Sequence, residues 1–223
     1  MNNHILINRH AGPIDAMTSE IMIASFLVVC LGCFFSVNLH NILSVHKKND
    51  EQEPPADVES PSGFTAGLAA LGTLFYFVEA CSYVFVAFSR IVTSSNALLS
   101  SFQSPFLVYM QVIGVVITTV GYSLFIWSVV ARGRYATSWG MRASHRLVTW
   151  GPYQYVRHPS YLGYFLMFLG LIAIWPNPIT LIPLIAIPGY TKVTLQEEKL
   201  LEQRFGDEYR EYQKKTGRFV PKF

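Results

Sequence analysis

Long runs of apolar residues alternate with shorter polar segments along most of the chain. Three of these runs cover residues 21–43, 64–88 and 106–131. Each exceeds the roughly 20 helical residues that cross the hydrocarbon core of a bilayer. We therefore predict a transmembrane helix over each of the three runs.

Two shorter apolar runs follow, over 161–175 and 179–193, on either side of Pro176-Asn177-Pro178. A Pro-Asn-Pro sequence is a strong turn signal. Fifteen residues rise only about 22 Å in a helix, which is short for a helix that crosses alone. We expect a tight helical hairpin here, extended by flanking residues or sheltered by the other helices.

The apolar period changes again after this hairpin. Leu201, Phe205, Tyr209 and Tyr212 recur at spacings of four, four and three, and Glu197 lies one turn before Leu201. These spacings place all five residues on one face of a helix. The pattern predicts a C-terminal amphipathic helix that lies against the bundle.

These elements together predict an all-α fold, an integral membrane helical bundle of five transmembrane helices with a C-terminal amphipathic helix. We expect residues 1–223 to form a single membrane domain. Within it, residues 1–131 would form a three-helix membrane part, and residues 132–223 a second part with the hairpin and the polar tail.

Composition supports the membrane assignment. Hydrophobic residues make up 51% of the chain, charged residues 14%, and the mean hydropathy is +0.31. Soluble domains carry about 25% charged residues. The pair Cys30-x-x-Cys33 lies inside an apolar run without a nearby His or a second Cys pair. We interpret these thiols as small apolar groups and predict no metal site.

Basic residues predict the orientation in the membrane. Fifteen of the 17 Lys and Arg residues fall on one side of the five predicted helices, and only Arg9 and Arg90 fall on the other. The positive-inside rule then places the N-terminus outside and the C-terminus in the cytosol. The membrane would be that of the endoplasmic reticulum in a eukaryote and the cell membrane in a prokaryote. The net charge of +3 thus reflects topology and contact with membrane lipids, and we expect no nucleic-acid partner.

Two polar motifs flank the predicted hairpin. Arg157-His158-Pro159 precedes it and Glu197-Glu198 follows it, and no acidic residue lies between Glu79 and Glu197. The two glutamates thus reappear where an Arg-His pair, one hairpin earlier, can meet them. We predict a functional site at this meeting point.

The residue types in these motifs suit a ligand that carries both signs of charge. Pro159 favours the first turn of a helix, whose free N–H groups attract an anion beside Arg157. His158 donates or accepts at neutral pH. Glu197 and Glu198 accept from an amine or from ribose hydroxyls, although neighbouring helical side chains diverge by about 100°, so we expect at most one to point into a pocket. The alternative is an Arg that reaches lipid headgroups and a His that caps the chain.

The order and spacing of these motifs resemble the isoprenylcysteine carboxyl methyltransferase family over about the last 80 residues. The resemblance rests on His145-x-Leu147-Val148-Thr149, Gly151-Pro-Tyr153, Arg157-His158-Pro159-x-Tyr161, Gly163, Glu197-Glu198-x-x-Leu201, Phe205-Gly206-x-Glu208-Tyr209-x-x-Tyr212 and Arg218-x-x-Pro221. It implies a membrane enzyme that uses S-adenosylmethionine to methylate the C-terminal carboxylate of a prenylated cysteine. Five predicted spans resemble the shorter microbial members.

Related families share the same C-terminal pattern. These are phospholipid N-methyltransferases, small-thiol S-methyltransferases and, more distantly, NADPH-dependent sterol reductases. The motif alone does not separate their acceptors, so these alternatives remain open at this stage. In each methyltransferase the donor would be S-adenosylmethionine, and the expected partner is a lipid-linked acceptor such as a prenylcysteine peptide or protein.

The resemblance also implies roles for individual residues. The implied catalytic residues are Arg157, Glu198 and Arg218, of which Arg157 or Arg218 would steer the acceptor carboxylate. The implied cofactor-binding residues are His145, Leu147, Val148, Gly151, Tyr153, Tyr155, His158, Pro159, Tyr161 and Glu197.

Glu79 is an ionisable residue inside a predicted span, which makes it a functional candidate by default. The predicted orientation places it well along its helix, away from the motif end. We therefore expect a structural hydrogen bond or a partner such as Arg90.

Overall fold

The computed structural model describes residues 13–47, 63–93, 105–133 and 146–222, and these are almost entirely helical. Its α-helices are α1 (Pro13–Lys47), α2 (Gly63–Thr93), α3 (Pro105–Arg132), α4 (Pro159–Ile174), α5 (Ala186–Phe205) and α6 (Asp207–Lys215). Two 3-10 helices, η2 (Gly151–Gln154) and η3 (Pro178–Ile185), precede α4 and α5. In the described part of the chain the only extended pairing is an isolated bridge.

Four helical stretches are long and apolar enough to cross a membrane, namely Thr18–Ser44, Gly63–Arg90, Phe106–Arg132 and Pro178–Phe205. The first three confirm the predicted helices over 21–43, 64–88 and 106–131. The fourth joins η3 to α5, and α4 is a shorter apolar helix of 16 residues. The chain is therefore a multi-pass membrane protein, and the part of it that the structure describes is helical.

The predicted turn at 176–178 is present. The side chain of Asn177 accepts hydrogen bonds from the backbone N–H groups of Ile179, at 2.9 Å, and Thr180, at 3.3 Å. This caps the start of η3, and Pro183 lies inside that 3-10 helix. Because proline lacks an N–H donor, it cannot complete the α-helical hydrogen-bond pattern there.

The helices on either side of this turn each also pack on another helix, α4 on α3 and α5 on α2, so the rest of the bundle shelters the hairpin. Helix α4 packs directly on α3, where an added Cβ on Gly163 would lie 2.9 Å from the carbonyl oxygen of Gly121. Helix α5 packs on α2, where an added Cβ on Gly189 would lie 2.7 Å from the backbone nitrogen of Ala69. Small residues allow this close approach of membrane helices.

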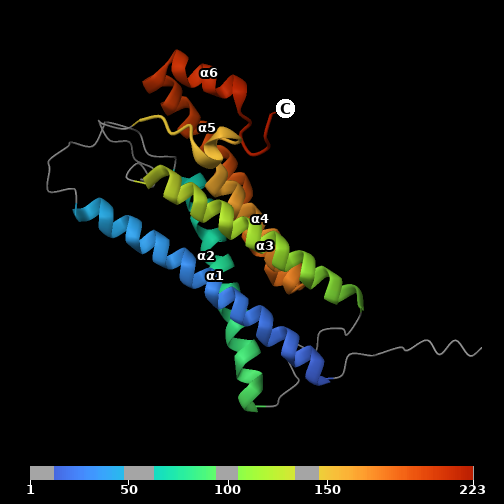
Figure 1. Ribbon diagram of the computed structural model, residues 1–223. Coiled ribbons are helices and arrows are strands. Elements are labelled where there is room, and N and C mark those ends of the chain that lie inside the picture. The colour runs from blue at the N-terminus through green and yellow to red at the C-terminus, as the bar shows by residue number, and fades with distance from the viewer. Residues whose placement is uncertain (1–12, 48–62, 94–104, 134–145, 223) are drawn as a thin grey trace, which may run out of the picture.

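The C-terminal tail is not one continuous helix, which corrects a prediction. Gly206 has a φ of +53°, a conformation that favours glycine, and it separates α5 from α6. Tyr209 and Tyr212 on α6 are buried, whereas Leu201 and Phe205 on α5 are only half-buried. Figure 1 shows α6 and the C-terminal segment at the end of the bundle where α3 ends and α4 begins.

Candidate functional site

The segment before α4 is held on the last turn of α3. The indole N–H of Trp150 donates to the main-chain carbonyl of Ala131 at 2.8 Å. Gly151 has a φ of +65°, and an added Cβ there would lie 3.0 Å from the Cβ of Ala131. Glycine at this position therefore lets η2 lie close against α3.

The C-terminal segment pairs with the same stretch from its other side. Val156 and Gly217 form a parallel bridge, in which the N–H of Arg157 donates to the carbonyl of Gly217 at 2.9 Å. The N–H of His158 donates to the carbonyl of Arg218 at 3.1 Å. Two segments about 60 residues apart in sequence are thereby fixed side by side.

Glu198 on α5 is the centre of the polar cluster. Its Oε1 accepts from Nε of Arg157 at 2.8 Å and from Nε of Arg218 at 3.1 Å, and lies 3.2 Å from Nε2 of His158. Its Oε2 accepts from Arg218 at 2.7 Å. Arg157 also donates to the main-chain carbonyls of Thr216 and Gln213. One buried carboxylate therefore joins the Arg-His motif, α5 and the C-terminal segment.

Glu197 binds the opposite side of the same histidine. Its Oε2 lies 3.4 Å from Nδ1 of His158, and its Oε1 accepts from the hydroxyl of Tyr161 at 2.7 Å. Both glutamates thus reach His158, one at each ring nitrogen, whereas the sequence led us to expect only one in a pocket. Half-buried Glu197 is the more accessible of the two carboxylates.

Aromatic rings continue the cluster into the bundle. The ring of Tyr161 stacks on that of His158 with centroids 5.7 Å apart and on that of Tyr190 at 4.6 Å. Tyr164 stacks on Tyr190 in turn, at 5.5 Å. These rings fill the space between α4 and α5, and their faces can attract a cation.

The electrostatics of the cluster favour a protonated histidine. Burial lowers the pKa of His158, but the hydrogen bonds and charges of Glu197 and Glu198 outweigh it, so the net shift is upward. Hydrogen bonds to Glu198 likewise raise the pKa of Arg218. The two carboxylates therefore face two guanidinium groups and an imidazole that tends to carry a positive charge.

Tyr153 is buried between this cluster and the end of α3. The hydroxyl of Tyr212 donates to its main-chain carbonyl at 2.7 Å. Burial raises the pKa of the Tyr153 hydroxyl, and the positive charge of nearby Arg132 opposes that rise. The hydroxyl of Tyr153 is thus influenced by the charges of both Arg132 and Glu197.

The structure brings together most of the residues that the sequence singled out. Arg157, His158, Tyr161, Glu197, Glu198 and Arg218 form one network, which confirms that the two motifs meet. Pro159 begins α4 as predicted, and Val148 and Tyr153 are buried around the network.

Other predicted site residues lie apart from the charged network. Tyr155 is 57% exposed, and Leu147 is half-buried in the segment leading to η2. Gly151 serves the contact with α3. His145 lies outside the described residues.

Three contributions to the site were missed in the sequence. Tyr190 stacks on Tyr161, the carbonyl of Thr216 accepts from Arg157, and Gly217 supplies the parallel bridge. An added Cβ on Gly217 would lie 1.6 Å from the carbonyl oxygen of Val220, so only glycine fits that turn. The glycine directly before Arg218 was the one feature of the sequence that could have indicated this turn.

Glu79 has a different environment from the one predicted. Arg90 pairs with Glu20 of α1 at 2.5 Å, which contradicts the proposed partnership between Arg90 and Glu79. Both carboxyl oxygens of Glu79 are buried without a hydrogen-bond partner in the described structure. The sequence analysis overlooked Glu20 because it lies just before the apolar run that defined the first span.

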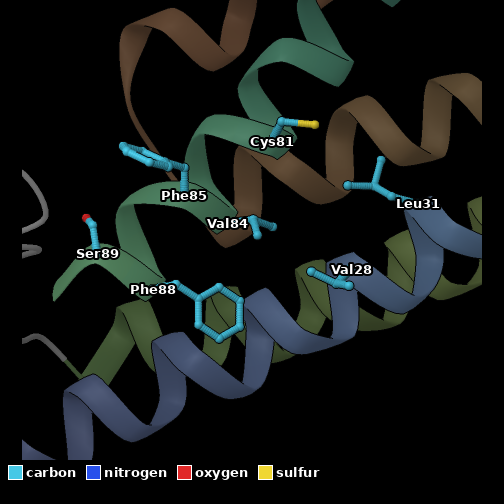
Figure 2. Close-up of a pocket in the computed structure, with 7 residues that line it drawn as sticks. All are labelled: Val28, Leu31, Cys81, Val84, Phe85, Phe88 and Ser89. Atoms are coloured by element: carbon cyan, nitrogen blue, oxygen red, sulfur yellow. The ribbon is translucent and has the colours of Figure 1, made fainter. Parts of the chain in front are cut away.

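An apolar pocket of about 760 Å³ lies between α1 and the second half of α2. Figure 2 shows Val28 and Leu31 on one side and Cys81, Val84, Phe85, Phe88 and Ser89 on the other. This part of α2 lies toward the end of the bundle opposite α6 (Figure 1). The pocket therefore contributes no residue to the polar cluster.

The cluster has the groups needed for a small ligand with both charges. Half-buried Glu197 can accept hydrogen bonds from an amine or a hydroxyl. Arg218, which is partly exposed, can donate to a carboxylate. The ring face of Tyr161 suits a cation. Among the residues described, no group of three or more His, Cys, Asp or Glu is arranged to hold a metal ion.

Comparisons with known proteins find similarity in the part of the chain that carries most of the polar cluster. Residues 109–208 match the phospholipid methyltransferase family. The chain is 39% identical over 79 residues to a protein-S-isoprenylcysteine O-methyltransferase of Schizosaccharomyces pombe, covering 34% of each protein. It is 30% identical over 118 residues to a probable protein-S-isoprenylcysteine O-methyltransferase of Oryza sativa subsp. indica, covering 51% of this chain and 62% of that protein.

A solved structure is also similar, that of the eukaryotic intramembrane Ras methyltransferase, isoprenylcysteine carboxyl methyltransferase. Its TM-score is 0.48 at 23% identity, and the match covers 72% of this chain and 53% of that one. In the first curated relatives, from Schizosaccharomyces pombe, Tribolium castaneum and Dictyostelium discoideum, the matched region spans about a third of each protein's length.

Proposed function

We propose that this chain is a member of the isoprenylcysteine carboxyl methyltransferase family and methylates the C-terminal carboxylate of a prenylated cysteine. The methyl donor would be S-adenosylmethionine. The observation that carries the proposal is the buried network in which Glu198 joins Arg157, His158 and Arg218. Arg157, His158 and Glu198 lie within residues 109–208, the segment that matches the phospholipid methyltransferase family.

In the proposed membrane arrangement the chain crosses five times, with the short helix α4 as the fourth crossing. The N-terminus would lie outside, and α6 and the C-terminus in the cytosol, in the endoplasmic reticulum of a eukaryote or the cell membrane of a prokaryote. The basic last turns of α3 and α6 belong to helix ends that lie toward one end of the bundle, which supports this orientation (Figure 1). Residues 132–223 would form the catalytic part.

The cluster fits S-adenosylmethionine through its donors and acceptors. Glu197 would accept from the amine or the ribose hydroxyls, and Arg218 would donate to the carboxylate. The stacked rings of Tyr161 and Tyr190 would lie near the sulfonium, which a ring face stabilises by cation–π attraction. When bound, this cofactor supplies an electrophilic methyl group.

The protein's own task is then to hold and orient the two reactants. A carboxylate acceptor is already ionised near neutral pH, so no side chain needs to remove a proton. Positioning the acceptor oxygen about 3 to 3.5 Å from the methyl carbon supplies much of the rate enhancement. The prenyl chain remains in the lipid and enters between helices.

A phospholipid amine methyltransferase is the main alternative, because residues 109–208 match the family of that name. An attacking amine would need a group that accepts its proton. The raised pKa of His158 favours its protonated form, and Glu198 already accepts from two arginines. These two side chains are therefore poor bases, which favours an acceptor that arrives as an anion.

The test is a methyl-transfer assay of the purified full chain in nanodiscs. Farnesylated cysteine, phosphatidylethanolamine and a small thiol are offered in parallel with labelled S-adenosylmethionine. We expect a base-labile methyl ester on farnesylated cysteine only. The Glu198→Gln variant should be inactive, and Arg210→Gln, which removes an exposed charge on α6, should be active. Methylation of phosphatidylethanolamine or the thiol alone would refute the proposal.

A further inference from the structure

The inward face of α3 ends in an arginine that the catalytic network does not use. Phe125, Ser128 and Val129 on this face are buried, and Arg132 follows Ser128 by four residues, which places it on the same face. Its Nε is fully enclosed and makes no hydrogen bond with any described residue. The Nε end of the Arg132 guanidinium is therefore enclosed by the protein, and no described residue gives it an anionic partner.

Two tyrosine hydroxyls are influenced by the charge of this arginine. Its positive charge acts on the hydroxyls of Tyr153 and Tyr164. The hydroxyl of Tyr153 in turn interacts with those of Ser128 and Ser160, which are both buried. Hydroxyl groups donate readily to a carboxylate or phosphate oxygen. The end of α3 and the start of α4 thus combine a cation with several hydroxyl donors.

The other two arginines of the site have no such spare capacity. Arg157 donates to Glu198 and to two main-chain carbonyls, and Arg218 donates to both oxygens of Glu198. Either must break a buried charge-assisted bond before it can bind another anion. Arg132 has no described anion to release, so an incoming anion can bind there without breaking such a bond.

The position of Arg132 also matches the side from which a lipid-linked molecule arrives. The last turns of α3 expose Trp127 and Val130, by 49% and 64%, on the surface available to the bilayer. Arg218, by contrast, follows α6 in the polar C-terminal segment. Tyr153 is influenced by both regions, because the charges of Arg132 and Glu197 both act on its hydroxyl.

We infer that Arg132 binds the carboxylate of the lipid-linked acceptor, with the hydroxyls of Tyr153, Ser128 and Ser160 beside it. The inference rests on the proposed function and assigns separate arginines to the two substrates. Arg218 serves the water-soluble donor, and Arg132 serves the acceptor. This replaces the expectation that Arg157 or Arg218 steers the acceptor carboxylate.

The test compares binding of two ligands to the full chain in phosphatidylcholine nanodiscs. One is N-acetyl-S-farnesylcysteine with a free carboxylate, and the other is its carboxamide. Charge-assisted hydrogen bonds are strong enough that we expect the unaltered protein to prefer the carboxylate by about 10-fold or more. Arg132→Gln should bind both ligands equally, while Arg132→Lys should retain a weaker preference because it keeps the charge but loses the planar fork.

Two controls guard against a general loss of structure. Arg210→Gln removes an exposed positive charge and should leave the preference unchanged. Binding of S-adenosylhomocysteine should be the same in Arg132→Gln as in the unaltered protein, since Arg132 lies on the acceptor side. In turnover, Arg132→Gln should raise KM for the acceptor about 10-fold or more with little change in KM for the donor.

The outcomes separate this inference from the proposed function. An Arg132→Gln variant that keeps the carboxylate preference overturns the inference, even if methyl transfer proceeds normally. A preference that depends on Arg132 in a protein that methylates no prenylated acceptor overturns the proposed function alone. If phosphatidylglycerol in the nanodisc, but not the farnesylcysteine carboxylate, loses its affinity on Arg132→Gln, then Arg132 holds lipid phosphates and the inference is wrong.

Discussion

Two buried glutamates in this protein have opposite surroundings. Glu198 on α5 is 6% exposed, and Glu79 on α2 is 4% exposed. Glu198 accepts hydrogen bonds from two arginines and lies within 3.2 Å of a histidine nitrogen, whereas neither oxygen of Glu79 has a described partner. Nearly equal burial therefore accompanies a fully paired charge in one region and an unpaired carboxyl in the other.

This comparison shows that partners, more than burial, identify a functional centre. Burying a charged carboxylate without partners costs free energy, so burial favours the neutral form of such a group. A buried carboxylate with several donors organises the segments that supply those donors, here the start of α4 and the C-terminal segment. The Glu20–Arg90 pair, at 2.5 Å, is a third case, in which one ion pair links α1 to α2.

The largest expected effect comes from removing the paired carboxylate. Glu198→Ala leaves Arg157 and Arg218 without their anion, and loss of one partner of a buried pair typically costs about 3–5 kcal/mol. We expect a much lower unfolding temperature in detergent and no methyl transfer. Glu202→Ala, which breaks the exposed pair with Arg210, is the matched control and should change little. Equal stability of the two variants would contradict the central role of Glu198.

A smaller effect is expected where the helices of the two glutamates meet. An added Cβ on Gly189 of α5 would lie 2.7 Å from the backbone nitrogen of Ala69 on α2. Gly189→Ala should therefore push α5 away from α2, destabilise the protein by about 1–3 kcal/mol and reduce methyl transfer by displacing Glu198. Gly67→Ala, on α2 where an added Cβ meets nothing within 4 Å, is the control and should be at least as stable as the unaltered protein.

The pH dependence of stability sharpens the comparison further. Glu197 and Glu198 raise the pKa of His158 above its ordinary value of about 6.5, despite burial. Protonated His158 therefore stabilises the fold fully below pH 6.5, and this contribution is lost as the pH rises through the raised pKa. The difference in unfolding temperature between the unaltered protein and His158→Gln should shrink over that rise. A difference that stays constant from pH 5 to 9 would show that His158 does not titrate in the fold.

The smallest effect is expected at Glu79. Because its carboxyl has no described partner, Glu79→Gln removes no interaction and should change the free energy of unfolding by less than about 1 kcal/mol. Methyl transfer should proceed at the rate of the unaltered protein. A large loss of activity at unchanged stability would show instead that Glu79 binds a group needed for turnover.

The helices were predictable because their signals are local. Apolar runs longer than a bilayer core predicted α1, α2 and α3, and Asn177 between two prolines predicted the turn before η3. The meeting of Arg157 with Glu198 was also predictable, since one hairpin brings the residues before and after it to the same end. In both cases the length of a segment and the order of residues along the chain largely determine the structure.

The tertiary structure decided which surfaces of those helices touch and which charges pair. Nothing in the sequence indicated that α4 would pack on α3 through Gly163, or that Arg90 would choose Glu20 over Glu79. Gly206 turned an apparent single helix into two, and so carried Gly217 to the backbone of Arg157. A periodic pattern records which face of a helix is apolar, because burial acts on every residue separately. Pairing depends on the distance between residues far apart in the chain, and only the folded packing sets that distance.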